Sequence, residues 1–151
     1  PDDWSPKISV IGLSEYLNQI SPLEQCIKAT DVDNLHIMTR GKSPANPSEM
    51  LSSERFREML DLLSQQYDHI IIDTPPVLAV TDSIIIAQYS GVNLVVARYA
   101  KTQIKELELT ISRFDQAGVK VNGFILNDIQ RTSGSSYGYN YAYAYTANKD
   151  D

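Results

Sequence analysis

The sequence predicts an α/β fold in which helices flank a parallel sheet. Short apolar runs suited to strands alternate with longer segments in which apolar residues recur at helical spacing. Such alternation is typical of right-handed strand–helix–strand crossovers, which produce parallel sheets. With 151 residues, 42% of them hydrophobic, the chain is long enough to form one domain with a substantial core.

The composition argues against several classes of function. The formal net charge of −6 disfavours general binding to nucleic acid or to an anionic membrane. The single cysteine, Cys26, cannot form an internal disulfide, which fits the reducing cytoplasm. The sequence contains neither an apolar run of membrane-spanning length nor a cleavable signal. Because the chain opens with Pro1 rather than Met, we expect it to be cut from a longer protein.

The first third of the chain predicts one helix and one strand after an irregular stretch over residues 1–10. A short helix is expected from the apolar spacing that begins at Leu13, and it should end before Pro22. Residues 35–38 predict a strand, which runs into a loop over residues 40–44.

This loop contains an incomplete phosphate-binding motif. Gly41-Lys42-Ser43 matches the end of a P-loop, in which backbone amides surround phosphates and the lysine reaches them. The first glycine of a P-loop lies five residues before Gly41, where this chain has His36. Pro44 also opposes the helix that must follow at once. We therefore do not expect this loop to hold phosphates.

A longer helix is expected to begin at Asn46 and to extend to Leu63. Asn46 would cap it, Pro47 suits its first position, and Glu49 can reach back to its start. Its apolar face would pack on the sheet and consists of Phe56, Met59, Leu60 and Leu63.

This helix leads into the most informative stretch, residues 70–76. Three consecutive isoleucines predict a strand buried on both faces, and the run ends in Asp73. Pro75 and Pro76 prevent the strand from continuing. An apolar strand that delivers an aspartate to its carboxyl end is typical of a Walker B strand, whose carboxylate helps hold Mg²⁺ beside bound phosphates. The alternative is a buried strand that Asp73 simply caps.

Two further strands are predicted to end in polar residues at the same edge. Residues 81–89 and 104–114 have helical spacing, whereas residues 94–97 and 119–126 predict strands. The carboxyl ends of parallel strands lie on one edge of the sheet, where ligands bind. We therefore expect three polar side chains to converge there, namely Asp73, Arg98 and Asn127.

The two histidines do not predict a metal site or a nucleophilic triad. His36 and His69 are isolated beside apolar residues, so we interpret both as structural. One cysteine without paired histidines does not make a zinc site. Nor does the sequence offer a Ser/His/Asp set.

The last twenty residues differ from the rest of the chain. Residues 132–136 predict a flexible spacer. Five tyrosines then alternate with small or polar residues and would lie on one side of an extended chain: Tyr137, Tyr139, Tyr141, Tyr143 and Tyr145. One interpretation is a strip of phenol hydroxyls for phosphorylation, in which each phosphate adds about −1.5 to −2 charge. The other is a low-complexity tail without a specific role.

Together these stretches resemble the bacterial tyrosine autokinases, or BY-kinases, of the Gram-negative type that controls capsule and exopolysaccharide polymerisation and export. The resemblance covers nearly everything after Val10. Its most specific part is the Asp-Thr-Pro-Pro run combined with a terminal tyrosine cluster. The matching stretches are Gly12-Leu13-Ser14-Glu15, Arg40-Gly41, Asn46-Pro47-Ser48-Glu49, residues 72–82, residues 96–99, residues 123–127 and the tyrosine tail.

The resemblance implies a P-loop NTPase fold of the partition-ATPase branch over residues 1–131, followed by a tyrosine-rich tail over residues 132–151. It implies ATP and Mg²⁺ as cofactors, with Asp73 helping to hold Mg²⁺ and Asn127 lying near the adenine. It further implies that Arg40 pairs with a phosphotyrosine, for which a planar guanidinium is suited. The alternative for Arg40 is an ordinary exposed loop arginine.

The resemblance also implies partners and a location. The tail tyrosines would be phosphorylated by neighbouring subunits of a homo-oligomeric ring. The other expected partners are the polysaccharide polymerisation and export machinery and a tyrosine phosphatase, but not nucleic acid. The intact protein would lie at the cytoplasmic face of the bacterial inner membrane.

The chain departs from the family pattern in one important respect. The family's Walker A loop and its second Asp-rich strand lie upstream of Gly12, and neither is present in these 151 residues. The tyrosine that would partner Arg40 should fall just before Pro1. We therefore expect this chain alone neither to bind ATP tightly nor to phosphorylate itself. Two other functions stay open: a non-catalytic phospho-acceptor or assembly module, and a partition-type ATPase switch, which has no reason to carry the tail.

Overall fold

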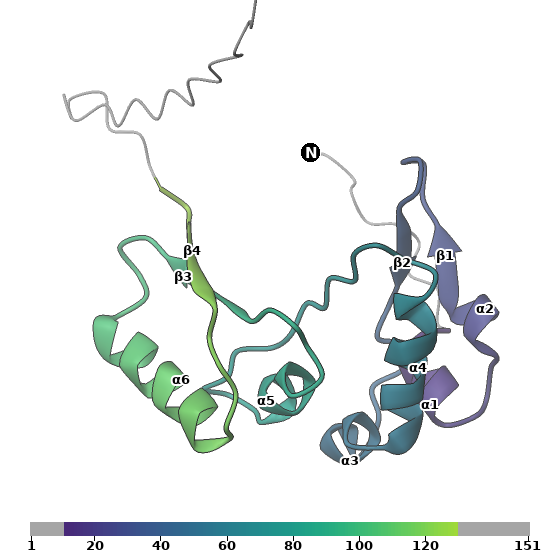
Figure 1. Ribbon diagram of the computed structural model, residues 1–151, viewed down its shortest axis with the longest axis horizontal. Helices are drawn as coiled ribbons and strands as arrows, with labels where there is room; N and C mark the ends of the chain where they lie inside the picture. The colour runs from purple at the N-terminus through teal and green to yellow at the C-terminus, as the bar shows by residue number, and fades with distance from the viewer. Residues whose placement is uncertain (1–10, 130–151) are drawn as a thin grey trace, which may run out of the picture.

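The computed structural model describes residues 11–129, which form two halves joined by a long connection (Figure 1). The elements in chain order are α1 (Leu13–Leu17), α2 (Leu23–Cys26), β1 (Ile27–Ala29), β2 (His36–Met38), α3 (Pro47–Leu51), α4 (Glu54–Ser64), α5 (Asp82–Ala87), β3 (Leu94–Arg98), α6 (Ile104–Gln116) and β4 (Gly123–Asn127). Among these residues, no helix is both long enough and apolar enough to cross a membrane.

The first half contains an antiparallel hairpin. β1 pairs with β2 so that Ile27 lies opposite Met38. The strand predicted over residues 35–38 is therefore present as β2, but the expectation that all strands are parallel is wrong here. Only residues 30–35 connect the two strands, whereas a parallel crossover needs about a dozen residues or more.

The helices α1, α2, α3 and α4 pack around one apolar core. Its buried members are Tyr16, Cys26, Leu51, Phe56, Met59, Leu63 and Ile86. The Arg55 guanidinium lies 4.2 Å from the centre of the Tyr16 ring, and its Nε donates a 2.9 Å hydrogen bond to the Tyr16 carbonyl. These two contacts fix α4 against α1.

The helix predicted from Asn46 to Leu63 is two helices in the structure. α3 ends at Leu51, and α4 begins after Ser53, whose Oγ accepts a hydrogen bond from the Phe56 amide at 3.3 Å. Serine favours helix ends because its hydroxyl competes for backbone groups, and Ser52 and Ser53 together break the helix. The apolar spacing from Phe56 onward nevertheless identified the buried face of α4 correctly.

The second half is a parallel pair of strands covered by α6. β3 and β4 run in register from Leu94 opposite Gly123 to Arg98 opposite Asn127. Phe114 of α6 packs with Val119 in a second apolar cluster. The predicted strands at 94–97 and 119–126 are thus present, the latter beginning later than expected, and their parallel pairing confirms the predicted α/β class.

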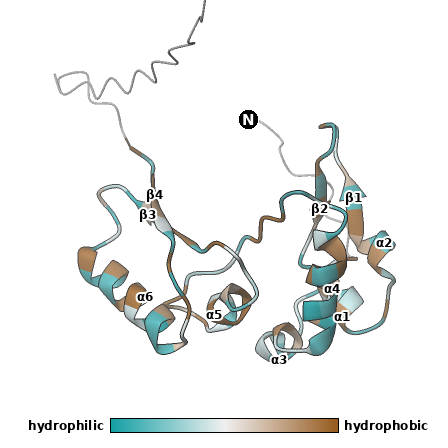
Figure 2. Ribbon diagram, in the orientation of Figure 1, coloured by the Kyte–Doolittle hydropathy of each residue, from teal (hydrophilic) through white to brown (hydrophobic). Residues whose placement is uncertain are grey.

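The three isoleucines before Asp73 do not form the predicted buried strand. Residues 70–72 have no strand assignment, and Ile71 is 94% exposed. β-Branched residues favour extended backbone, but a strand also needs a neighbour to complete its hydrogen bonds, and none of the described strands pairs with this segment. The apolar run is instead part of the connection between the two halves (Figure 2).

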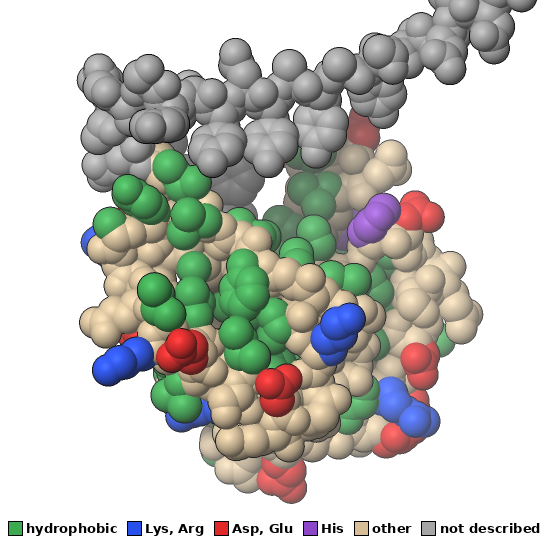
Figure 3. All heavy atoms as spheres, turned by 60° about the vertical axis from the view of Figure 1, so that its left-hand side comes forward, with side chains coloured by type: hydrophobic (Ala, Val, Ile, Leu, Met, Phe, Trp, Pro, Cys, Tyr) green, Lys and Arg blue, Asp and Glu red, His purple; other side chains and the backbone are tan. Residues whose placement is uncertain are grey.

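The short helix α5 belongs to both halves. Ile86 joins the apolar core of the first half, and the next residue, Ala87, joins the cluster of the second. Hydrophobic side chains also stand exposed over the half that contains α6, β3 and β4 (Figure 3). They include Leu94, Val96, Ile104 and Phe124, each more than half exposed.

Candidate functional site

A groove of about 900 Å³ runs along the first half and along the residues that follow α4. Its floor is apolar and includes Phe56 and Met59. Its polar lining includes Arg40, Asp73 and Asp82, which come from three separate segments. The structure therefore brings Asp73 and Arg40, which the sequence singled out for different reasons, to the same groove.

Asp73 is an exposed side chain at the end of the isoleucine run. The turn after it is fixed to α5, because the Ser83 hydroxyl donates a short hydrogen bond to the Pro75 carbonyl. The Ala79 amide donates to the Pro76 carbonyl at 2.9 Å, which continues the turn toward α5. Because Asp73 is exposed and lines the groove, its carboxylate is in reach of a ligand there.

Arg40 lies on the loop after β2, and that loop is hydrogen-bonded to the start of α1. The Leu13 amide donates to the Thr39 carbonyl, and the Ser14 amide donates to the Arg40 carbonyl, both at 2.9 Å. Arg40 is exposed to solvent. The loop backbone is thus fixed while the Arg40 side chain faces solvent.

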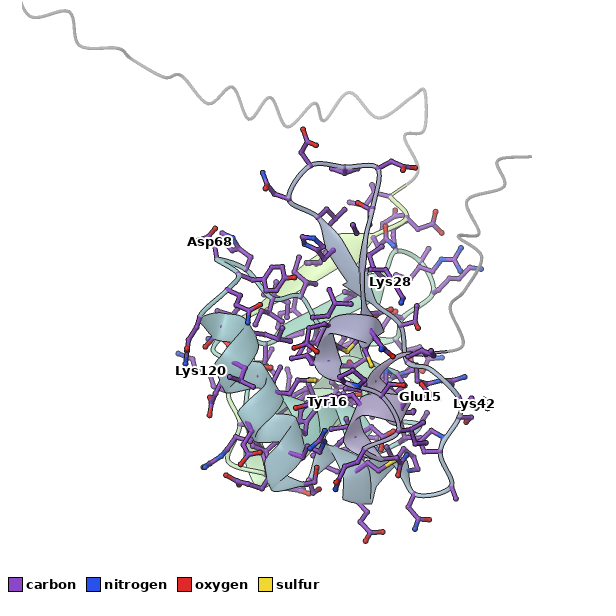
Figure 4. The ribbon with its side chains drawn as sticks, turned by 90° about the vertical axis from the view of Figure 1, so that its right-hand side faces the viewer. Glu15, Tyr16, Lys28, Lys42, Asp68 and Lys120 are labelled. Atoms are coloured by element: carbon purple, nitrogen blue, oxygen red, sulfur yellow. The ribbon has the colours of Figure 1, made fainter. Side chains whose placement is uncertain are left out.

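Glu15 completes this attachment. Its Oε2 accepts a 2.7 Å hydrogen bond from the Gly12 amide, and its Oε1 accepts a 3.2 Å hydrogen bond from the Lys42 amide. The residue is only 5% exposed. The Gly12 amide first, and then the Lys42 amide and its charge, hold the pKa of this carboxyl below its usual value, although burial acts in the opposite direction. Figure 4 shows Glu15 and Lys42 next to each other.

The Gly41-Lys42-Ser43 triplet does not form a phosphate cradle. Gly41 has φ +78°, and a Cβ on it would collide with the Glu15 carboxylate. The Lys42 amide, which would face phosphate in a P-loop, is bonded to Glu15. The next helix, α3, begins only at Pro47. The structure agrees with the sequence argument against a P-loop at this position.

Asp82 is a groove residue that the sequence predicted only as part of a helix over residues 81–89. Its Oδ1 accepts a 2.7 Å hydrogen bond from the Ser48 hydroxyl, which also lies 3.4 Å from the Thr81 hydroxyl. Ser48 belongs to α3 and Asp82 to α5, so this contact joins the two helices. Ser48 and Asp82 both lie in stretches that match the kinase family. That match was the feature of the sequence that could have pointed to them.

Arg98 and Asn127 are brought together as predicted, at the carboxyl ends of β3 and β4. The Arg98 Nε contacts Asp128 Oδ2 at 2.7 Å, and the Asp128 amide donates to Asn127 Oδ1 at 2.8 Å. Asp128 has φ +59°, which turns the chain sharply after β4. Asp73 does not join this pair through strand hydrogen bonds, because its segment pairs with neither strand. Of the three residues predicted to converge, only Arg98 and Asn127 are joined by paired strands.

The remaining predicted site residues lie outside the described part of the chain. They are the five tail tyrosines, Tyr137, Tyr139, Tyr141, Tyr143 and Tyr145. Their role stays a prediction.

The groove chemistry fits part of a magnesium–phosphate site. Magnesium is usually held by one or two carboxylates together with substrate phosphates, and Asp73 supplies one such carboxylate. Among residues 11–129, no three His, Cys, Asp or Glu side chains cluster as a metal site by themselves. An Mg²⁺ ion would therefore take its other ligands from a nucleotide, from water or from other residues. Arg40 adds a guanidinium suited to phosphate oxygens.

Comparison with known proteins identifies the family. The family model for the AAA domain matches residues 7–123. The chain is 68% identical over 122 residues to the tyrosine-protein kinase ptk of Acinetobacter johnsonii, and 48% identical over 139 residues to the tyrosine-protein kinase wzc of Salmonella typhimurium. These alignments cover 81% and 91% of the chain but only 17% and 19% of the two relatives.

A solved structure shares the fold. The kinase domain of the Escherichia coli tyrosine kinase ETK superposes with a TM-score of 0.78 at 39% identity, covering 88% of this chain and 53% of that one. This agreement confirms the predicted P-loop NTPase fold class. The chain thus spans about half of a solved kinase domain. It therefore belongs to the AAA domain family and is a relative of the bacterial tyrosine-protein kinases.

Proposed function

We propose that this chain is part of an ATP-dependent protein-tyrosine autokinase that regulates capsule or exopolysaccharide synthesis and export. The observation that carries the proposal is the exposed Asp73 carboxylate on the rim of a groove that also contains Arg40. The similarity to named tyrosine-protein kinases supports it. In the intact protein, ATP would supply the phosphoryl group, and Mg²⁺ would neutralise charge on its phosphates.

Each site residue has a distinct proposed role. Asp73 holds Mg²⁺, and Asn127 contacts the adenine from the carboxyl end of β4. Arg40 binds a phosphotyrosine through its guanidinium. The tyrosines of the segment 132–151 are the acceptors, and a neighbouring subunit in a homo-oligomeric ring phosphorylates them. Polysaccharide polymerisation and export proteins and a tyrosine phosphatase are the remaining proposed partners, at the cytoplasmic face of the inner membrane.

The exposed apolar segments support the proposal that further residues of the complete kinase cover them. Ile71 is 94% exposed and Val96 is 61% exposed, although both belong to runs typical of buried strands. The solved relative is about twice as long as the matched part. We propose that residues of the complete kinase beyond these 151 pair with residues 70–72 and supply the phosphate-binding loop. This chain alone would then neither bind Mg·ATP tightly nor phosphorylate itself, which isothermal titration with Mg·ATP tests.

Replacing Asp73 tests the catalytic proposal. In the intact kinase, Asp73→Asn should abolish autophosphorylation while leaving the protein folded, because an amide binds Mg²⁺ poorly and Asp73 is exposed. Phosphotyrosine would be measured by mass spectrometry, and folding by circular dichroism. Asp68→Asn, at another exposed aspartate, is the matched control and should keep its activity. Full activity of the Asp73 variant would refute the assignment.

Replacing the tail tyrosines tests the acceptor proposal. Phenylalanine at Tyr137, Tyr139, Tyr141, Tyr143 and Tyr145 removes the phenol hydroxyls and nothing else. Most of the phosphotyrosine signal of the intact kinase should disappear, while ATP binding should be unchanged. An unchanged signal would mean that another segment is the acceptor.

A second function is favoured by a specific observation, namely that Gly41-Lys42-Ser43 is packed against Glu15 and cannot receive phosphate. The chain would then be a non-catalytic phospho-acceptor or assembly module that another subunit modifies. Incubating it with an active intact relative and Mg·ATP tests this second function. Phosphate on its tail without any self-phosphorylation supports the acceptor module for this chain.

A further inference from the structure

The backbone around Arg40 is held at three positions by the first turn of α1. The Thr39 carbonyl accepts from the Leu13 amide and the Arg40 carbonyl accepts from the Ser14 amide, each at 2.9 Å. Two residues beyond Arg40, the Lys42 amide donates to Glu15. The attachment therefore lies on both sides of the arginine, and only its side chain is left free to reach a ligand.

The Glu15 carboxylate is the centre of this attachment. Its two oxygens accept separately from the Gly12 amide at 2.7 Å and the Lys42 amide at 3.2 Å, so one side chain joins the helix start to the far side of the loop. Glu15 is buried, whereas the carboxylates of most globular proteins stay in water. Burial of an ionised group is tolerated when hydrogen bonds compensate it, and here the compensating donors belong to the two segments that it joins.

Gly12 and Gly41 allow the start of α1 and the Arg40 loop to approach each other closely. A Cβ on Gly12 would collide with the Thr39 carbonyl, and a Cβ on Gly41 would collide with the Glu15 carboxylate. Gly41 also has φ +78°, a conformation that side chains with a Cβ rarely adopt. The two motifs Gly12-Leu13-Ser14-Glu15 and Arg40-Gly41 therefore form one structural unit, although 24 positions separate Glu15 from Thr39 in the sequence.

We propose that Glu15 is the positioning residue of Arg40: its ionised carboxylate holds the Thr39–Lys42 loop on α1 and thereby presents the guanidinium to a phosphotyrosine. This inference rests on the proposed phosphate-binding role of Arg40. Glu15 itself lies beneath the loop and does not touch the ligand. Neutralising the Glu15 carboxylate releases the Thr39–Lys42 loop from α1 and thereby weakens phosphate binding. The fraction of protein with bound ligand therefore depends on the fraction whose loop is attached to α1.

The first experiment tests the attachment in the wild-type chain by nuclear magnetic resonance. Across an acidic pH series, the Gly12 and Lys42 amide protons should shift together with one midpoint below the usual glutamate pKa, because the same carboxylate accepts from both. Burial together with the Glu15 charge raises the pKa of the neighbouring Cys26 thiol, which moves its titration further from the acidic range. Independent midpoints, or none, would overturn the proposal.

The second experiment measures binding of N-acetyl-O-phosphotyrosine amide from the saturable shift of the Arg40 Nε resonance, or of neighbouring amides when Arg40 is replaced. Glu15→Gln replaces one accepting oxygen by an NH₂ group that faces a donor, so one of the two hydrogen bonds is lost. We expect binding to weaken roughly tenfold to a hundredfold, the range for losing one hydrogen bond to a charged group. Glu24→Gln, at an exposed glutamate of α2, is the control and should bind normally.

A double variant separates positioning from general destabilisation. Arg40→Ala should weaken binding, and adding Glu15→Gln should weaken it no further, because the two residues act through one contact. If Arg40→Ala binds as well as wild type, the proposed role of Arg40 fails, and this inference fails with it. If Arg40→Ala loses binding but Glu15→Gln does not, only the positioning role of Glu15 is overturned.

Discussion

At the scale of single residues, the chemistry of this protein depends on polar and charged side chains more than on its apolar runs. Asp73 is predicted from the apolar run that it ends and Arg40 from the family resemblance, and both line one groove. Glu15 was quoted only as part of a motif, yet it is the buried carboxylate that fixes the Arg40 loop. Sequence spacing could not show this because the two segments meet only in the folded chain.

The low pKa of Glu15 predicts that acid destabilises the protein in a defined range. The carboxyl binds its proton less readily in the folded chain than in the unfolded chain. Its stabilisation is therefore complete above the unfolded glutamate pKa of about 4.3 and is lost as the pH falls through the lower folded value. Urea unfolding across this range should show a steeper loss of stability for wild type than for Glu15→Gln. Equal pH dependence in the two proteins would contradict the prediction, and Glu24→Gln should behave like wild type.

At the scale of secondary structure, apolar spacing predicted which faces are buried, and polar residues decided where elements end. The spacing from Phe56 to Leu63 identified the core face of α4. The sequence did not predict the break between α3 and α4. A helix can accommodate serine, and only the structure shows that the hydroxyls of Ser52 and Ser53 bond backbone carbonyls there. The extent of each helix was therefore less predictable than its existence.

The cap of α4 gives a prediction at this scale. Ser53→Ala removes the oxygen that accepts from the Phe56 amide and should destabilise the protein by about 1 kcal/mol. In a chain of this size the melting temperature should fall by about 2–4 °C, measured by circular dichroism. Ser43→Ala is the matched control, because Ser43 is exposed on the loop between β2 and α3, and it should change stability by less than about 0.5 kcal/mol. Equal effects of the two changes would argue against the cap.

At the scale of the whole molecule, α5 is the element through which the two halves meet. Neighbouring residues of this helix, Ile86 and Ala87, belong to different apolar clusters. The Ser48 hydroxyl reaches Asp82 at the start of the same helix at 2.7 Å. Because this hydrogen bond links α3 to the first residue of α5, it should matter for how firmly α5 is held.

Removing that hydrogen bond should loosen α5 selectively. Ser48→Ala leaves Asp82 without its partner, and the loss of a hydrogen bond to a charged group costs about 1.5–3 kcal/mol, with the lower end expected at a partly exposed site. Hydrogen exchange should accelerate at the amides of α5 but not in α4 or in β3 and β4. Ser64→Ala, at the exposed end of α4, should leave the exchange of α5 unchanged. Uniform acceleration throughout the chain would instead indicate general destabilisation.

The sequence by itself determined the α/β class, the buried face of α4, the parallel ends at Arg98 and Asn127, and the candidate magnesium ligand Asp73. These follow from local periodicity and from residue chemistry, which act over a few positions. Only the tertiary structure decided that β1 and β2 are antiparallel, that residues 70–72 lack a strand partner, and that Glu15 holds the Arg40 loop. Each of these depends on which distant segment supplies a hydrogen-bond partner, and a side-chain pattern along one segment does not specify its neighbour in space.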